Sequence, residues 1–162
     1  MTDSGDAATP LGTVPRDIDI WTDGSCRPNP GFGGWAAILR NSEGQTRSFS
    51  GGEAMTTNNR MELHAAIAGL SALKRPSRVV LYADSEYVVR GMTLWLARWQ
   101  EGRWRTTSGK PVLNADLWAI LVAAAEPHEV TWQWVQGHAD NPMNVQADAL
   151  ANAARLRTAR EG

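Results

Sequence analysis

The sequence predicts an α/β fold in which a sheet with antiparallel and parallel strands has helices on its faces. Two observations predict this class. Three strand-like segments follow one another on short turns near the start of the chain, which is typical of an antiparallel meander. Stretches with helical apolar spacing then alternate with two further strand-like segments, and an insertion that bears a helix separates the last two strands.

The composition is that of one ordinary globular domain. The chain has 162 residues, of which 43% are hydrophobic and 20% charged, and this excludes wholesale disorder. Sixteen basic and seventeen acidic side chains give a net charge of −1, so any affinity for nucleic acid must come from a local patch. The apolar runs are too short to span a bilayer. Because Cys26 is the single cysteine and residues 1–16 lack a secretory pattern, we expect a cytoplasmic protein.

The strands are identified by alternating or continuous short apolar runs. They are expected at residues 17–21, 35–39, 46–50, 79–82 and 129–135. The first is expected to stop at the turn-forming residues 22–25, and the third is expected to stop before Gly51-Gly52. The run 79–82 is continuously apolar, which is typical of a buried central strand.

The helices are identified by apolar residues at helical spacing and by their capping residues. In the first helix Asn59 stands three residues before Glu62, a capping-box spacing, and Pro76 is expected to end the element. Ser85 opens a short helix, and Asn141-Pro142 are expected to begin the last one. The faces expected to be buried are Leu63, Ala66, Ile67, Leu70 and Leu73, then Leu117, Ile120, Leu121 and Ala124, and finally Ala147, Leu150, Ala151 and Ala154.

One domain is expected over residues 17–157. Residues 1–16 are polar, small and interrupted by proline, and we expect a disordered extension there. A flexible tail is expected at residues 158–162. The insertion is expected to be irregular over residues 93–110.

Four acidic residues stand out as candidate metal ligands. Asp23 and Asp84 follow predicted strands, Glu62 lies in the first turn of a helix, and Asp148 lies on the last helix. Converging carboxylates repel one another and need cations, and oxygen ligands without Cys or His suit Mg²⁺ or Mn²⁺. Each also has a structural interpretation: a turn residue, a partner in the cap of Asn59, a helix cap and a solvated helix residue. Periodicity alone does not bring the four together.

Two further features have both a functional and a structural interpretation. His138 lies in a loop after a strand, where it suits proton transfer or is simply a surface residue. Between Arg90 and Lys110 there are five basic residues and one acidic residue, interleaved with three Trp. This pattern suits contact with phosphates and stacking on bases or sugars. Trp95 and Trp99, four residues apart, equally suit docking of the segment on the core.

Five sequence motifs occur in a characteristic order: Trp21-Thr22-Asp23-Gly24-Ser25-Cys26, Asn29-Pro30-Gly31, Thr57-Asn58-Asn59-Arg60-Met61-Glu62-Leu63, Asp84-Ser85-Glu86-Tyr87-Val88 and Trp134-Val135-Gln136-Gly137-His138-Ala139. Through them the chain closely resembles bacterial type 1 ribonuclease H over about residues 17–156. The resemblance implies a ribonuclease H-like fold, with a five-stranded sheet of three antiparallel and two parallel strands flanked by helices. It also implies cleavage of the RNA strand of RNA–DNA hybrids, leaving 3′-hydroxyl and 5′-phosphate ends.

The resemblance also assigns roles to particular residues. Asp23, Glu62, Asp84 and Asp148 match the family's metal ligands, which implies two Mg²⁺ ions, with Mn²⁺ as a substitute, and His138 matches a residue that assists proton transfer or product release. Asn29, Asn58, Asn59 and the backbone at Cys26 match contacts to the RNA strand. Thr57 and Asn114 match a pocket for a DNA phosphate, and Trp95 a contact to deoxyribose. We expect Arg98, Trp99, Arg103, Trp104 and Arg105 to form a handle that binds the hybrid.

Two positions depart from the family pattern. The handle has arginines where a bacterial relative has a lysine-rich helix, so we expect weaker and less salt-sensitive binding of hybrid. Glu86 stands where a glutamine is often found, and its charge would repel phosphates. We expect a monomer without an obligate protein partner or a membrane attachment. The alternatives are a DNA-cutting nuclease of the same fold and a module that binds hybrids without cutting them.

Overall fold

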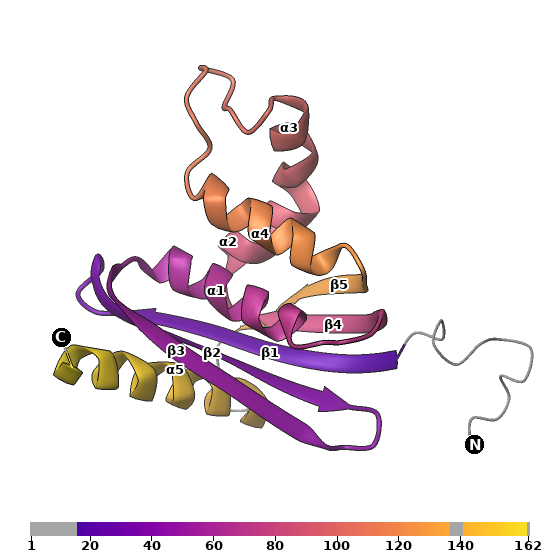
Figure 1. The fold of residues 1–162 in the computed structure, drawn as a ribbon, viewed down its shortest axis with the longest axis vertical. Coiled ribbons are helices and arrows are strands. Elements are labelled where there is room, and N and C mark those ends of the chain that lie inside the picture. Colours follow the sequence, from indigo (N-terminus) through magenta and orange to yellow (C-terminus); the bar gives the residue numbers. More distant parts are fainter. Residues whose placement is uncertain (1–15, 137–140, 162) are drawn as a thin grey trace, which may run out of the picture.

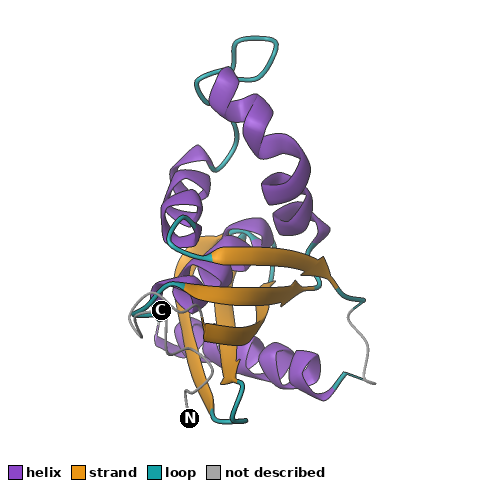
Figure 2. Ribbon diagram, turned by 90° about the vertical axis from the view of Figure 1, so that its right-hand side faces the viewer, coloured by secondary structure: helices purple, strands orange, loops and turns teal. Residues whose placement is uncertain are grey.

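The structure is a computed structural model that describes residues 16–136 and 141–161. Its centre is a five-stranded sheet in the order β3-β2-β1-β4-β5 (Figures 1 and 2). The strands are β1 (Arg16–Cys26), β2 (Gly31–Asn41), β3 (Thr46–Thr56), β4 (Ser77–Ala83) and β5 (Glu129–Trp134). The first three are antiparallel, whereas β4 pairs in parallel with both β1 and β5. The predicted fold class is therefore confirmed.

Helices lie on both faces of the sheet. They are α1 (Asn58–Ser71), α2 (Glu86–Arg90), the π-helix η2 (Gly91–Trp95), α3 (Leu96–Glu101), α4 (Ala115–Ala125) and α5 (Pro142–Glu161). α1 packs on one face of β1 and β2, and α5 packs on the other (Figure 1). Residues 91–113 rise away from the sheet as a protrusion. In the part of the chain that the structure describes, no helix is long and apolar enough to cross a membrane.

Two strands continue through residues that were expected to end them. β1 continues through residues 22–25 to Cys26, and β3 continues through Gly51-Gly52 to Thr56. The predicted ends were wrong because β2 supplies backbone partners throughout: Trp35 pairs with both Gly24 and Gly51. The residues that favour turns in isolation are held extended by this ladder. As a result Asp23 lies inside β1 rather than at its end.

The helix starts are partly as predicted. The Oδ1 of Asn141 accepts from the backbone N–H of Asn144 at 3.1 Å, which confirms the cap of α5. The cap expected at Asn59 is wrong, because Thr57 is the N-cap of α1 and its Oγ1 accepts from the Arg60 N–H at 3.2 Å. α1 also ends at Ser71, so Leu73 lies beyond the helix.

The insertion and the chain end are more helical than expected. Residues 93–101 are helical in η2 and α3 rather than irregular. α5 continues to Glu161, where a flexible tail was expected from residue 158. In that last turn Thr158 Oγ1 donates to the Ala154 carbonyl at 2.9 Å. The predicted extension, residues 1–16, lies outside the described residues apart from Arg16, which begins β1.

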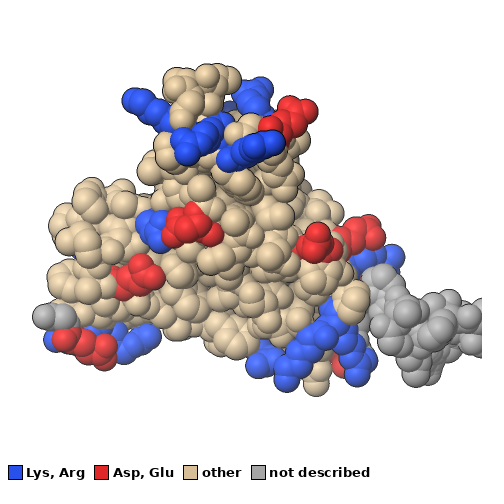
Figure 3. Space-filling view, turned by 45° about the horizontal axis from the view of Figure 1, so that its top comes forward, with Lys and Arg blue, Asp and Glu red and all other residues tan. Residues whose placement is uncertain are grey.

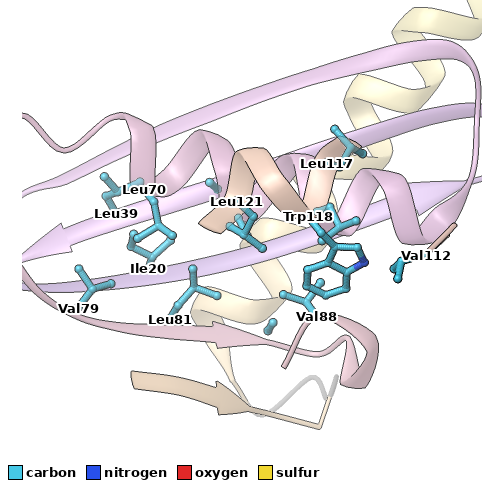
Figure 4. Close-up of a cluster of buried hydrophobic side chains, with 14 residues drawn as sticks. Ile20, Leu39, Leu70, Val79, Leu81, Val88, Val112, Leu117, Trp118 and Leu121 are labelled. Atoms are coloured by element: carbon cyan, nitrogen blue, oxygen red, sulfur yellow. The ribbon is translucent and has the colours of Figure 1, made fainter. Parts of the chain in front are cut away.

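The main core lies between the sheet and the layer formed by α1 and α4 (Figure 4). The buried face of α4 is Leu117, Trp118 and Leu121, and the indole of Trp118 is fully buried. Ile120, which was expected on this face, is 50% exposed. A spacing of three and four residues from Leu117 fits both Ile120 and Leu121, and the helix is rotated so that Trp118 enters the core instead.

Leu121 and Ile120 form a matched pair for testing this orientation of α4. We expect Leu121→Ala to lower the free energy of unfolding by about 2–5 kcal/mol, because it leaves a cavity in the core. Ile120→Ala, on the exposed side of the same helix, should cost less than about 1 kcal/mol. Urea unfolding checks both values. They can be compared if the slope m, the dependence of the unfolding free energy on urea concentration, is the same in both variants. Equal losses would contradict the orientation of the helix.

Candidate active site

The pairing of β1 with β4 places Asp23 beside Asp84. The last parallel pair in this register is Thr22 with Ala83, and it is followed by Asp23 in β1 and by Asp84 directly after β4. The two carboxylates therefore meet where β4 ends and the chain parts from β1, which continues to Cys26. Asp23 is only 4% exposed. The side of an α/β sheet at which strands end and helices begin is where such folds bind ligands.

A close approach of α1 to β1 brings Glu62 to the same point. A Cβ atom on Gly24 would lie 2.5 Å from the backbone N of Glu62, so a side chain there would push the helix away. With glycine the helix packs directly on the strand, and Glu62 is buried beside Asp23. Asp23, Glu62 and Asp84 each offer a carboxylate oxygen, and these oxygens all lie within 4.8 Å of one another.

α5 supplies Asp148 from the opposite face of the sheet. A Cβ atom on Gly34 would lie 2.3 Å from the Ala151 carbonyl oxygen, so glycine again permits the contact between helix and strand. Asp148 is exposed and lines the same cavity of about 330 Å³ as Asp23, Glu62 and Asp84. The fold thus brings together the four acidic residues that sequence periodicity left apart.

The surroundings of these carboxylates favour their protonated forms in the absence of a cation. Burial raises the pKa of Asp23 to about 9, and the nearby charges of Asp84 and Asp148 add to the shift. Burial first and the charge of Asp23 second raise the pKa of Glu62 well above its ordinary value. The pKa of Asp84 is also raised, again mainly by burial. Such shifts mean that ionising these carboxylates costs free energy, which is common at functional sites.

Three buried carboxylate oxygens have no hydrogen-bond partner among the described residues. They are Asp23 Oδ2, Glu62 Oε1 and Asp84 Oδ1. Buried polar atoms are normally satisfied, and oxygen atoms of this kind are the ligands that hard divalent cations prefer. The residues present therefore fit a divalent-cation site.

The structural interpretations of Glu62 and Asp84 are wrong. The cap of α1 is Thr57, so Glu62 has no capping partner to complete, and the cap of α2 is Ser85, whose Oγ accepts from the Val88 N–H at 3.3 Å. Asp23 does accept from the Gly24 N–H at 2.9 Å, but within a strand rather than a turn.

A polar network that the sequence analysis missed joins the strand of Asp23 to the helix of Asp148. Ser25 Oγ donates to Asn152 Oδ1 at 2.8 Å, and Arg155 Nε donates to Ser25 Oγ at 3.1 Å. Asn152 Nδ2 in turn donates to the backbone carbonyl of Asp148 at 3.0 Å. The available signal was the spacing of Asn152 and Arg155, four and seven residues after Asp148, which places all three on one face of a helix.

Residues predicted to contact RNA lie beside the carboxylates. Asn58 lines their cavity, and its backbone N–H donates to Asn29 Oδ1 at 3.1 Å, which ties the turn after β1 to the start of α1. Asn59 follows on the same half-exposed turn. The thiol of Cys26 is buried and faces backbone carbonyls, including that of Pro28 at 3.3 Å. The thiol of Cys26 is therefore turned away from solvent, and a contact through its backbone stays a prediction.

Residues predicted to contact DNA gather where α1 meets α4. Asn114 precedes α4 with a φ of 62°, a left-handed conformation that asparagine tolerates. Its Oδ1 accepts from Arg60 Nη1 at 3.2 Å, and Arg60 also donates to both carboxylate oxygens of Asp116 at 3.0 and 3.1 Å. Thr57 lies one turn before Arg60. Arg60 was not singled out in the sequence as a site residue, although it lies within the motif that contains Thr57.

Within the protrusion the tryptophans pack against one another and the core, whereas the arginines are exposed. The ring centroids of Trp95 and Trp99 are 5.7 Å apart, and those of Trp99 and Trp118 are 5.1 Å apart. Because Trp118 is buried, these contacts connect the protrusion to the core. Trp104 packs against Trp99 at 6.1 Å. The basic side chains Arg98, Arg103 and Arg105 are exposed. Figure 3 shows Lys and Arg gathered over this part of the surface.

Glu86 and His138 are the remaining residues to which the sequence assigned a role. Glu86 is exposed and forms an ion pair with Arg90 at 2.9 Å, so part of its charge is balanced within α2. His138 lies outside the described residues.

Comparisons with known proteins agree on one family. The RNase H family model matches residues 15–155. Ribonuclease H from Acidiphilium cryptum is 56% identical over 144 residues, which cover 89% of each chain. Ribonuclease H from Bordetella pertussis is 52% identical over 137 residues, covering 85% of this chain and 88% of the relative.

Solved structures give the same result. LC9-RNase H1, a type 1 RNase H with the type 2 active-site motif, is 32% identical with a TM-score of 0.81, over 90% of this chain and 74% of that one. LC11-RNase H1, solved in complex with RNA/DNA hybrid, is 25% identical with a TM-score of 0.64, over 86% of this chain and 97% of that one.

The raised pKa values predict how the metal-free protein responds to pH. Between the ordinary aspartate pKa of 3.8 and about 9, folded Asp23 keeps a proton that the unfolded chain has released. The free energy of unfolding should therefore fall as pH rises, by up to about 1.4 kcal/mol per pH unit for each such proton. Urea unfolding in EDTA at pH 7, 8 and 9 measures this slope. The window lies above the pKa of His128, which burial lowers from 6.5.

Two controls accompany that measurement. Saturating Mg²⁺ should flatten the slope, because a bound cation replaces the protons, and Asp23→Asn should reduce it without metal. Metal-free stability that does not change between pH 7 and 9 would contradict the burial of charge described above.

Proposed function

The chain belongs to the RNase H family, and on that premise we propose that it is a metal-dependent endoribonuclease that hydrolyses the RNA strand of RNA–DNA hybrids. The observation that carries the proposal is the group of Asp23, Glu62 and Asp84, whose oxygens lie within 4.8 Å of one another and include buried atoms without partners among the described residues. The relatives named ribonuclease H and the hybrid complex of LC11-RNase H1 support the choice of substrate.

We propose that the four carboxylates hold two divalent cations when substrate is bound, Mg²⁺ first and Mn²⁺ as a substitute. Paired cations at such a site supply an activated water and stabilise the leaving 3′-oxygen, which would give 3′-hydroxyl and 5′-phosphate ends. The protein itself contributes by holding the four carboxylates at fixed positions. Asp23 and Glu62 give up the protons that burial favours and act as ligands, not as bases. His138 would assist proton transfer or product release.

Selection of a hybrid requires separate contacts to its two strands. The amides of Asn29, Asn58 and Asn59 can pair with a 2′-hydroxyl, which is both donor and acceptor and marks RNA. Thr57 and Asn114 would bind a phosphate of the DNA strand. Trp95 would pack against deoxyribose, where a 2′-hydroxyl would clash, so that double-stranded RNA is rejected. The backbone at Cys26 completes the proposed RNA contact.

Two alternatives make different predictions. A DNA-cutting nuclease of the same fold would cleave duplex DNA, and a hybrid-binding module would bind without turnover in Mg²⁺ or Mn²⁺. A monomeric state, the absence of an obligate protein partner and a cytoplasmic location stay predictions.

Cleavage of one labelled RNA strand tests the function directly. The strand is presented alone, paired with DNA and paired with RNA, in Mg²⁺, in Mn²⁺ and in EDTA. We expect cutting of the hybrid only, with either metal and not in EDTA. Asp23→Asn should lower kcat by about 100-fold or more, because it removes one charge from the cation site at nearly constant shape. Cutting of double-stranded RNA as well would refute the role of Trp95, and binding without cutting would refute the enzyme.

The exposed arginines of the protrusion should contribute to binding through phosphates. We expect Arg98→Ala to lower the slope of log affinity against log salt by about 0.9, the value for one phosphate contact. Arg157, exposed on α5, is the matched control, and Arg157→Ala should leave the slope unchanged. Fluorescence anisotropy of a labelled hybrid in EDTA over a range of salt concentrations gives both slopes. Equal slopes for wild type and Arg98→Ala would remove this contact from the binding surface.

A further inference from the structure

The hydroxyl of Tyr87 lies at the centre of a hydrogen-bond network between α1, α2 and α4. It bonds Asn114 Nδ2 at 3.1 Å and Trp118 Nε1 at 3.0 Å. An indole N–H can only donate, so the Tyr87 oxygen is the acceptor of the bond with Trp118. Trp118 is fully buried, which holds this end of the network in place.

The direction of the second bond follows from Arg60. Its guanidinium can only donate, and it donates to Asn114 Oδ1 at 3.2 Å. The amide of Asn114 is therefore oriented with its oxygen toward Arg60 and its NH₂ group toward Tyr87. The Tyr87 oxygen then accepts two hydrogen bonds. In the part of the chain that the structure describes, its own O–H donates to no group.

Thr57 and Asn114, like Tyr87, each have an acceptor atom that already receives a hydrogen bond from the protein. Thr57 Oγ1 accepts from the Arg60 backbone N–H at 3.2 Å, which leaves its hydroxyl hydrogen free. Asn114 uses one hydrogen of its NH₂ group on Tyr87 and keeps the other. The acceptor atom of each side chain is occupied by a donor from the protein, and each retains one hydrogen that no other described residue accepts. Together they form a set of donors that suits a ligand made only of acceptor atoms.

The position of Tyr87 fits a role toward the DNA strand. Its ring meets the edge of Trp95 at a centroid distance of 6.1 Å and packs against Trp118 at 5.2 Å. Tyr87 thus stands between Asn114, the proposed phosphate contact, and Trp95, the proposed deoxyribose contact. It is half-buried rather than enclosed.

We propose that the Tyr87 hydroxyl donates a hydrogen bond to the DNA-strand phosphate that Thr57 and Asn114 bind, and that Arg60 orients the Asn114 amide for the same phosphate. The proposal rests on the proposed function and adds a specificity residue to it. A phosphate oxygen accepts and never donates, so it matches all three free hydrogens at once. Asp116 balances the charge of Arg60, so the recognition depends on donor geometry as well as on charge.

A scan of single methylphosphonates along the DNA strand tests the proposal. Each removes the charge and one acceptor oxygen from one phosphate. For wild type we expect one position at which KM rises about tenfold with little change in kcat. In Tyr87→Phe the unmodified hybrid should already have a raised KM, and the additional penalty at that position should fall below about threefold.

Tyr82→Phe is the matched control. Tyr82 is the other tyrosine of the chain, and it stacks on Trp21 at 5.2 Å, away from this network. This variant should keep the full tenfold penalty. If Tyr87→Phe raises KM and yet keeps the full penalty, the hydroxyl only supports the fold and the proposal is overturned. Wild-type protein that neither binds nor cleaves the hybrid would refute the proposed function instead.

A second measurement does not depend on the folding of Tyr87→Phe. In the double variant Asp23→Asn, Tyr82→Phe, 3-fluorotyrosine labels Tyr87 alone, and its ¹⁹F resonance can be followed without cleavage of the hybrid. Unmodified hybrid should shift the resonance. A hybrid with the methylphosphonate at the sensitive position should shift it much less. Identical shifts for the two hybrids would overturn the contact.

Discussion

Repulsion among buried carboxylates is the interaction on which the rest of this site depends. Burial and mutual charge both oppose ionisation of Asp23, Glu62 and Asp84, and the ionised carboxylates would move apart if the backbone let them. The backbone holds them together instead. The parallel register fixes the two aspartates, and the absence of a Cβ at Gly24 seats the helix of Glu62 directly on the strand. Rigid backbone contacts thus sustain an arrangement that the side chains alone oppose.

The sequence predicted the order and type of most elements, and it failed where tertiary pairing overrides local preference. Residues 22–25 favour a turn by composition, but β2 pairs with them and keeps them extended. The capping spacing of Asn59 and Glu62 was present by coincidence, since Thr57 caps the helix and Glu62 is buried. In each failure a long-range contact decided between local conformations that the sequence alone leaves close in energy.

The candidate site was predicted through resemblance and not through local pattern. The spacing of Asp23, Asp84 and Asp148 in the sequence does not show that they meet. They are brought together only by the strand register and by the way α5 packs on the sheet. The network of Ser25, Asn152 and Arg155 was missed for the same reason: its partners are about 130 residues apart in the chain, and they depend on how α5 lies on the sheet.

The row of indoles from Trp104 through Trp99 and Trp95, together with Trp118, has an optical consequence. These four of the eight tryptophans lie close enough for their rings to exchange excitation energy. Light absorbed by any of them is shared, so a group that quenches Trp95 from outside dims the emission of the whole set. If the proposed contact at Trp95 quenches its indole, association with the protrusion can be timed from the intrinsic fluorescence without attaching a dye.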